Sequence, residues 1–266
     1  DEFKKNNVVI IIMESLSKEF VGFYNNHNLT PFLDSLAKHS LIFNNAFSNG
    51  LRSIEALPAI TASIPTLSNT PFISSVYAQN TFNALPYLLK KNGYSTSFFH
   101  GGTRGTMGFY GFAKKAGFQN YYGLEEYDNM DDYDGTWGIY DHSFLKYFSK
   151  KLSEKKEPFL STFFSLSAHP PYNIPEKYKT TFKDGDLEIH KLISYSDYSL
   201  KLFFESIKNE DWFNNTLFVI TSDHTSPKSS DNFYKNKIGR YSIPMLFYTP
   251  NKSLNGQSDV FTQHID

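Results

Sequence analysis

Side chains that bind metals or phosphates stand directly after apolar runs at four places in the chain. These side chains are Glu14 after Val8–Met13, His100 after 96–99, His169 after 159–167, and Asp223 with His224 after 217–222. In an open α/β sheet the ligand crevice lies outside the carboxyl ends of the parallel strands, so residues distant in sequence can meet there. This pattern predicts the active site of an enzyme.

Two carboxylates and one imidazole in this set have the chemistry of metal ligands. A carboxylate that follows six apolar residues lies at a strand end or is buried, and a buried Glu14 needs a cation or a hydrogen-bonded partner. Asp223 and His224 alone are also compatible with a helix cap beside a solvated imidazole. The chain has no cysteine, which excludes a thiolate site. We therefore expect one divalent metal, Zn²⁺ or Mn²⁺ with Mg²⁺ as a further candidate, held by oxygen and nitrogen ligands.

Ser53 is the candidate nucleophile. It stands between the turn at 49–50 and an Ile-Glu-Ala-Leu stretch, which predicts the N-terminus of a helix, where backbone N–H groups favour an anion. Taken alone, Ser53 is an ordinary N-cap residue without a capping box. Coordination to a divalent metal would lower the pKa of its hydroxyl and generate a nucleophilic alkoxide. The neighbouring Arg52 is a candidate ligand for substrate oxygens.

Four further residues are candidates for the substrate pocket. His169 precedes two prolines that fix its loop, which suits proton transfer, although an isolated histidine is more often an ordinary loop residue. His100 and Arg104 flank a Gly-rich stretch that resembles a phosphate-binding nest but lacks the ending of a P-loop. Trp137 could face a sugar or glycerol, with core packing as the alternative. The remaining histidines are interpreted as structural: His27, His39, His142, His190 and His264.

Apolar runs and helical spacing alternate along the chain. The predicted strands are 8–13, 94–99, 159–167, 217–222 and 244–248. The predicted helices are 31–37 with Thr30 as N-cap, 82–92, 143–153 and 189–208. This alternation predicts an α/β fold with a mostly parallel central sheet and helices on both faces. Two segments rich in Gly, Tyr and Asp, 101–123 and 127–138, are predicted as long loops beside the site.

Composition narrows the class of protein. The 266 residues are 40% hydrophobic, enough for one large core, and we expect a single catalytic domain over 1–266. The formal net charge of −1 gives no electrostatic footprint for nucleic acid. No apolar run approaches the roughly 20 residues of a membrane span, and the sequence starts without a signal-peptide pattern.

Five motifs in order resemble the sulfatase-like branch of the alkaline phosphatase superfamily, and most closely the phosphoglycerol transferases of the lipoteichoic acid synthase type. The motifs are those at 7–17, 29–37, 52–60, 98–102 and 222–225. The resemblance implies an alkaline phosphatase/sulfatase-like fold and a single-metal site made by Glu14, Ser53, Asp223 and His224. It places Ser53 at the position of the family's nucleophilic threonine, and it places His100 and His169 in the substrate pocket.

The chain also departs from its relatives. Serine replaces the threonine nucleophile, and the tryptophan–arginine pair that grips glycerol phosphate has no clean counterpart, because Arg104 lies early and 107–110 occupy the expected place. The Cys/Ser-x-Pro-x-Arg signature of formylglycine sulfatases is absent after Ser53. Phosphoethanolamine transferases share the fold but usually contain disulfides, which this chain cannot form.

The resemblance implies a metal-dependent phosphoglycerol transferase with a covalent phospho-serine intermediate. The expected donor is a lipid-linked phosphodiester such as phosphatidylglycerol, and the expected acceptor is a glycan or glycolipid. We expect an extracytoplasmic catalytic domain tethered to the cell membrane through a preceding segment. The alternatives are a phosphodiesterase, a phosphatase or a phosphoethanolamine transferase of the same superfamily and, from a different class, an inactive module that binds envelope glycans or lipids.

Overall fold

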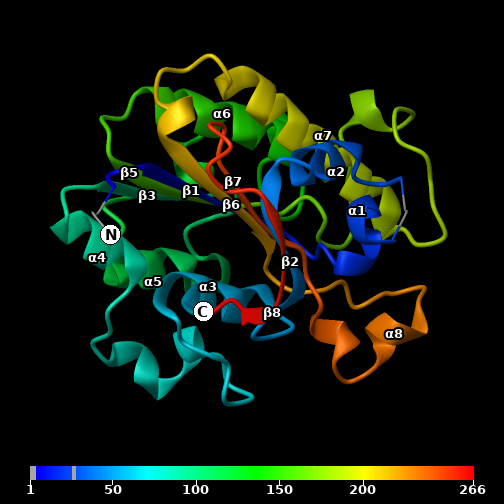
Figure 1. Ribbon diagram of the computed structural model, residues 1–266, viewed down its shortest axis with the longest axis horizontal. Helices are drawn as coiled ribbons and strands as arrows, with labels where there is room; N and C mark the ends of the chain where they lie inside the picture. The colour runs from blue at the N-terminus through cyan, green and yellow to red at the C-terminus, as the bar shows by residue number, and fades with distance from the viewer. Residues whose placement is uncertain (1–3, 26–27) are drawn as a thin grey trace.

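The computed structural model describes residues 4–25 and 28–266, which leaves His27 outside the described residues. Its centre is an eight-stranded sheet in the order β4-β3-β5-β1-β6-β7-β2-β8 (Figure 1). The strands are β1 (Asn7–Met13), β2 (Ser40–Phe47), β3 (Ser95–His100), β4 (Asn120–Tyr122), β5 (Phe159–Phe164), β6 (Thr216–Ser222), β7 (Met245–Tyr248) and β8 (Gly256–Gln263). All neighbours pair in parallel except β7, which is antiparallel to both β6 and β2. The predicted mostly parallel sheet is confirmed.

Helices cover both faces of the sheet. They are α1 (Gly22–Asn25), α2 (Pro31–Ala37), α3 (Ser53–Ala62), α4 (Leu85–Lys91), α5 (Phe109–Ala116), α6 (Asp141–Ser153), α7 (Ile189–Ile207) and α8 (Asn232–Lys235). Figure 1 shows α2, α6 and α7 above the sheet and α3, α4 and α5 below it. Among the described residues, none of these helices combines the length and the apolar character that crossing a bilayer demands.

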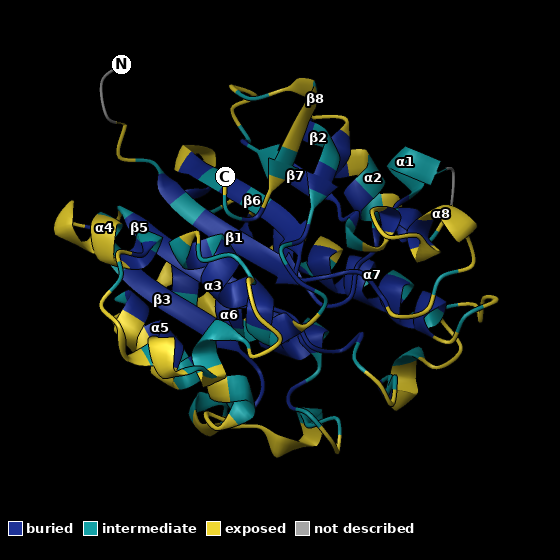
Figure 2. Cartoon of the chain, turned by 90° about the horizontal axis from the view of Figure 1, so that it is seen from below, coloured by how far each residue is buried: buried dark blue, intermediate teal, exposed yellow. Residues whose placement is uncertain are grey.

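Strand β1 shows why both faces of the sheet are covered by helices. Its side chains alternate between two cores, as the period of two in a strand requires. Val9 and Ile11 pack in the cluster that holds the α6 and α7 aromatics, whereas Ile10 and Ile12 pack with Leu57 of α3 and the aromatics of α5. The central strands are buried, while β8 at the sheet edge is largely exposed (Figure 2).

The segment 101–123 is not the long loop that its Gly and Tyr content suggested. It contains α5 and β4. Phe109, Phe112, Ala113 and Ala116 are the buried positions of α5, and their spacing of three, one and three residues is a helical signal. Strand β5 ends at Phe164 rather than 167, and α4 begins at Leu85 rather than 82.

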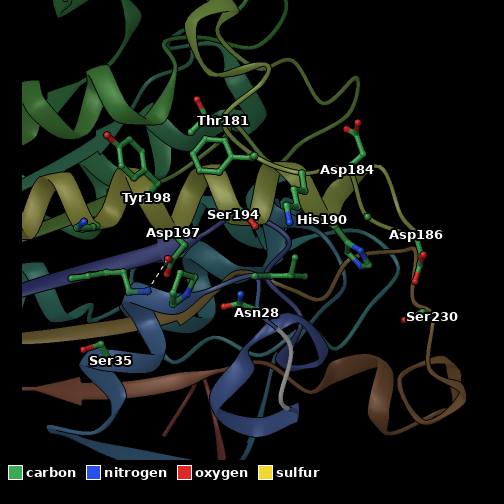
Figure 3. Close-up of a pocket in the computed structure, with 17 residues that line it drawn as sticks. Asn28, Ser35, Thr181, Asp184, Asp186, His190, Ser194, Asp197, Tyr198 and Ser230 are labelled. Atoms are coloured by element: carbon green, nitrogen blue, oxygen red, sulfur yellow. Dashed lines mark hydrogen bonds between the residues drawn. The ribbon is translucent and has the colours of Figure 1, made fainter.

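The start of α2 is capped from another helix. Thr30 is the N-cap residue, as predicted, but its side chain makes no capping hydrogen bond. The buried carboxylate of Asp197 on α7 instead accepts from the backbone N–H groups of Phe32 and Leu33, at 2.9 and 2.8 Å. Figure 3 shows this contact in a surface groove between α2 and α7. Burial raises the pKa of Asp197 to about 7.

Candidate active site

The carboxyl ends of β1 and β6 bring together three candidate metal ligands. Met13 and Ser222 are register partners at the ends of these two parallel strands, so the residues that follow them leave the sheet side by side. Glu14, Asp223 and His224 are all buried, and one potential ligand atom from each lies within 4.8 Å of the others. The predicted convergence of these distant residues is present in the structure.

Serine hydroxyls fix the backbone that carries these ligands. Ser165 Oγ accepts from the N–H of Glu14 at 2.7 Å, and Ser222 Oγ donates to the Met13 carbonyl at 2.8 Å. Ser15, whose φ is 55°, donates its N–H to Asp223 Oδ1 at 2.8 Å and its hydroxyl to Glu14 Oε1 at 2.7 Å. The two strand ends are therefore tied together by groups that sequence reasoning missed.

Ser53 joins the same cluster from a different element. It is the first residue of α3, as predicted, and it is buried. Its Oγ donates to Glu14 Oε2 at 3.2 Å and lies 3.3 Å from His224 Nε2. The hydroxyl thus lies within hydrogen-bond distance of two of the three candidate metal ligands.

The turn before Ser53 is held by a carboxylate. Glu55, at the third position of α3, accepts from the N–H groups of Leu51 and Arg52 at 2.9 and 3.1 Å. Arg52 rather than Ser53 is the N-cap residue and its side chain makes no capping hydrogen bond, so Ser53 forms no capping box, as expected, and Glu55 alone caps the turn. Gly50 makes this contact possible, since a Cβ at that position would lie 2.4 Å from Glu55 Oε2.

The cluster has the chemistry of a cation site. His224 Nδ1 lies 2.8 Å from the Thr225 carbonyl, which only accepts, so Nδ1 carries the proton and Nε2 presents a lone pair. That lone pair lies 3.2 Å from Asp223 Oδ2, a buried oxygen that accepts no hydrogen bond from the described residues. Ligands bound at about 2.0–2.2 Å in tetrahedral geometry lie about 3.3–3.6 Å apart. Facing acceptors at this spacing fit one divalent metal.

The electrostatics of the cluster agree with this interpretation. Burial and the nearby Asp223 carboxylate raise the pKa of Glu14 well above its usual value. Two buried carboxylates repel each other unless a proton or a cation neutralises them. Without a metal this cluster retains a proton, and a divalent cation would replace it.

His100, His169 and Trp137 line one small cavity with Glu14. His100 ends β3, with Nδ1 3.3 Å from the Phe164 carbonyl, and burial lowers its pKa to about 4. His169 Nδ1 and Trp137 Nε1 both donate to the Pro170 carbonyl, at 2.9 and 2.6 Å, and their rings lie 4.1 Å apart. Each imidazole therefore directs Nδ1 to a backbone carbonyl, which leaves Nε2 as the nitrogen that can bind or exchange a proton in the cavity.

The two arginines lie outside this cluster. Arg104 is half exposed and forms an ion pair with Glu126. The described residues that line the cavity beside Glu14 do not include it. Arg52 pairs with Glu55 and donates to the Asn69 carbonyl at 3.0 Å. Their roles in substrate binding stay predictions, because neither guanidinium is directed to Ser53 by a contact in this structure.

His264 supports the site from behind. It is buried, as expected of a structural residue, and its Nε2 lies 2.8 Å from the Ser222 carbonyl. That carbonyl belongs to the peptide directly before Asp223. Asp141, also missed, accepts from the N–H groups of Leu166 and Ser167 at 3.0 and 3.3 Å and holds the segment that leads to His169.

Solved structures with this architecture define the class. A protein of the alkaline phosphatase superfamily from Vibrio parahaemolyticus is 27% identical, with a TM-score of 0.89 over 100% of this chain and 65% of that chain. The lipoteichoic acid synthase LtaP from Listeria monocytogenes has a TM-score of 0.87 at 21% identity, over 99% and 70% of the two chains. The fold is that of the alkaline phosphatase superfamily. Residues 6–266 match the Sulfatase family, and the chain belongs to that family.

Curated relatives include several lipoteichoic acid synthases. The lipoteichoic acid synthase-like protein YvgJ of Bacillus subtilis is 26% identical over 231 residues, which cover 83% of this chain and 37% of the relative. A lipoteichoic acid synthase of Staphylococcus aureus is 25% identical over 264 residues, covering 94% and 41%. The chain spans less than half the length of these curated relatives. Together with the site, the likeness supports an enzyme of the sulfatase superfamily with a divalent metal.

Proposed function

We propose that the chain is the catalytic part of a metal-dependent phosphotransferase that moves a phosphoglycerol-type headgroup from a lipid phosphodiester to a hydroxyl acceptor. The observation that carries this proposal is the position of Ser53 Oγ, 3.2 Å from Glu14 and 3.3 Å from His224. A serine hydroxyl among metal ligands is an activated nucleophile. The similarity to lipoteichoic acid synthases supports phosphatidylglycerol as donor and a glycan or glycolipid as acceptor.

The residues that would hold the metal are Glu14, Ser53, Asp223 and His224. When bound, a divalent cation such as Mn²⁺ or Zn²⁺ lowers the pKa of the Ser53 hydroxyl and neutralises charge on the phosphoryl oxygens. A structure of the periplasmic domain of EptC from Escherichia coli in complex with Zn, similar in fold at a TM-score of 0.71, supports Zn²⁺ as one candidate.

Transfer of the headgroup takes place in two steps, referred to as the first and the second half of the cycle. In the first, Ser53 Oγ, which enters the step without its proton and is returned in that state by the second half, forms a bond to phosphorus, the bond from phosphorus to the lipid oxygen breaks, and protonated His169 gives its Nε2 proton to the departing alcohol. In the second, neutral His169 takes the proton of the acceptor hydroxyl at Nε2, the new oxygen attacks phosphorus, and the bond to Ser53 breaks. His169 ends each cycle protonated, as it began.

His100 has a different part in this scheme. Because its Nδ1 faces a backbone carbonyl and its pKa is lowered to about 4, the ring is neutral at physiological pH and offers a lone pair at Nε2. A lone pair accepts from a hydroxyl and does not attract an anionic oxygen. We therefore assign His100 to a hydroxyl of the headgroup rather than to the non-bridging phosphate oxygens.

The test is the Ser53→Ala variant with a phosphatidylglycerol analogue. We expect turnover and the covalent phospho-serine, detected by intact mass, to disappear while metal binding is weakened but present. Turnover at the unmutated rate would refute Ser53 as the nucleophile. Product analysis with and without a glycerol-containing acceptor separates the transferase from a phosphodiesterase, because the second half differs only in which hydroxyl enters.

We also propose that residues 1–266 act as one catalytic domain outside the cytoplasm. The name of the EptC structure, which describes a periplasmic domain, and the envelope polymer named in the curated relatives support this location. Protease accessibility of the chain in intact cells tests it.

A further inference from the structure

Two surface segments that adjoin residues of the candidate site carry five exposed apolar side chains. We call residues 63–80, which follow α3, the first mouth segment, and residues 225–241, which follow His224, the second. Their exposed apolar residues are Leu67 (88%), Val76 (82%) and Tyr77 (64%) in the first segment, and Phe233 (50%) and Ile238 (66%) in the second. Single exposed apolar residues are ordinary, but five on two segments beside one site call for a physical reason.

The first mouth segment touches the nucleophile side of the site. Its Asn69 carbonyl accepts from Arg52 Nη2 at 3.0 Å, next to Ser53. Its turn at 72–74 packs closely on the turn at 106–108. The approach is so close that a Cβ added at Gly108 would lie 2.8 Å from Ile73 Cγ2. Met107, in that second turn, lines the site cavity. The segment therefore forms one rim of the cavity.

The second mouth segment borders the site at His224. It begins directly after His224, and the Thr225 hydroxyl donates to the Arg240 carbonyl at 2.5 Å, which closes the segment on itself. Its last residue, Tyr241, accepts from the N–H of Ser48 at 2.8 Å, in the turn that leads to α3. Figure 1 shows both segments below the sheet, with α3 between them.

Charge distinguishes this surface from the rest of the chain. The second mouth segment holds Lys228, Lys235, Lys237 and Arg240 against Asp231, a formal charge of +3, whereas the whole chain has −1. Lys228 pairs with Glu188, and Lys235 and Lys237 are exposed. The first mouth segment has no charged residue. An uncharged apolar rim beside a cationic, apolar one is complementary to an anionic lipid surface.

We propose that the two mouth segments dock on an anionic bilayer, with Leu67, Val76 and Phe233 among the side chains that enter the headgroup region. Tyrosine, the type of Tyr77, is enriched at membrane interfaces, and phenylalanine, the type of Phe233, is common on the apolar face of segments that lie in the interface. Docking would place the cavity against the headgroups, so a lipid donor reaches Ser53 without leaving the bilayer. The use of a lipid donor rests on the proposed function, whereas the docking surface itself does not.

The experiment is co-sedimentation with vesicles of phosphatidylcholine alone or with added phosphatidylserine. Phosphatidylserine supplies negative charge without being the proposed donor, so capture by the active site does not imitate docking. We expect binding to the anionic vesicles, weakened by salt. Phe233→Ser with Ile238→Ser should reduce binding at least about tenfold, and Lys235→Gln with Lys237→Gln about fivefold for each charge removed. Val260→Ser, at a position on β8 that is 67% exposed, is the matched control and should bind normally.

Ser53→Ala separates this proposal from the proposed function. The variant should bind vesicles like the unmutated protein, because docking does not need the nucleophile. Binding without turnover of any phosphodiester would leave the docking surface standing and remove the proposed function. Equal binding to neutral vesicles, equal losses in Val260→Ser, or no binding at all would overturn the docking surface. So would a change of self-association in the Phe233 and Ile238 variant without a change in vesicle binding, because the face would then bind a second copy.

Discussion

Replacing Glu14 with glutamine should leave the metal-free protein at least as stable as before while it removes most of the stabilisation by metal. The substitution keeps the size of the side chain and one side-chain oxygen. That oxygen can still accept from the Ser15 hydroxyl, which lies 2.7 Å from Glu14 Oε1 in the unmutated protein. It removes one of two buried negative charges. Most substitutions of buried residues destabilise a protein, so this expectation discriminates sharply between a metal site and an ordinary buried network.

The magnitude follows from the distance between the ligand atoms. Those of Glu14 and Asp223 lie within 4.8 Å of each other, and two unit charges at that distance repel by about 3.5 kcal/mol at an effective dielectric constant of about 20. The metal-free protein can avoid this cost by keeping a proton on Glu14, so the gain is smaller than the full repulsion between the two charges. A metal at about 1,000 times its Kd stabilises the unmutated protein by about 4 kcal/mol.

The pH dependence gives the sign of the effect. Because burial and Asp223 raise the pKa of Glu14 in the folded state, the folded protein holds this proton more tightly than the unfolded chain does. Its stability is therefore fully present below the unfolded pKa and falls as the pH rises through the folded pKa. Glu14→Gln lacks this loss, so the difference between the two proteins should be smallest below the unfolded pKa of Glu14 and largest above its raised folded pKa.

The assay is urea unfolding of both proteins from pH 4.5 to 8.5, with a chelator and with excess Zn²⁺ or Mn²⁺. The contributions of Asp141 and Asp197, whose pKa values burial also raises, cancel in the difference. The interpretation fails if the metal-free variant is more than about 1 kcal/mol less stable than the unmutated protein at pH 8, or if metal stabilises both proteins equally. Either result would mean that Glu14 is held by its hydrogen bonds rather than reserved for a cation.

Two other substitutions test the support of the site. Gly50→Ala should displace the Glu55 carboxylate, because the new Cβ would lie 2.4 Å from its Oε2, and it should lower kcat at least tenfold. Gly111→Ala in α5 is the control, because an added Cβ there meets nothing within 4 Å. This control should raise stability by about 0.5–1 kcal/mol in urea unfolding. An unchanged kcat in Gly50→Ala would show that the turn before Ser53 needs no fixed geometry. His264→Ala should weaken metal binding by about 10- to 100-fold in calorimetry, and His264→Gln, which can still donate to the Ser222 carbonyl, should restore most of it; equal losses in both variants would contradict a positioning role.

The parts of the fold that the sequence predicts are those whose signal is local. Strand β1 holds an apolar run from Val8 to Met13 and β6 holds one from Leu217 to Ile220, and such runs are typical of parallel strands covered on both faces. The residue that follows each strand is then placed at the sheet edge by geometry alone. For this reason Glu14, Asp223 and His224 were identifiable before their contacts were known.

The missed elements depend on contacts distant in sequence. Strand β2 carries Asn44 and Asn45 in its middle, and β8 is exposed at most positions, so neither has the alternation that marks a strand. They are strands because they pair with each other in parallel. The roles of Ser165 and Ser222 were missed for the same reason, since both fell inside predicted strands and their hydrogen-bond partners lie on other segments.

The buried carboxylates of the site and the packing that holds them in place lie at different positions along the same two strands, β1 and β6. Glu14 and Asp223 place two carboxylates in a buried position where a proton or a cation must neutralise one of the charges, while a few residues earlier β1 and β6 are packed between two aromatic cores. A sheet fixed on both faces cannot spread its strand ends to relieve the repulsion, because packed cores resist deformation. The metal-free protein therefore relieves the repulsion by holding a proton on Glu14, and a cation that displaces this proton removes the need for it. It follows that substitutions in the two cores should weaken metal affinity by loosening the strand ends, even where they leave every ligand in place.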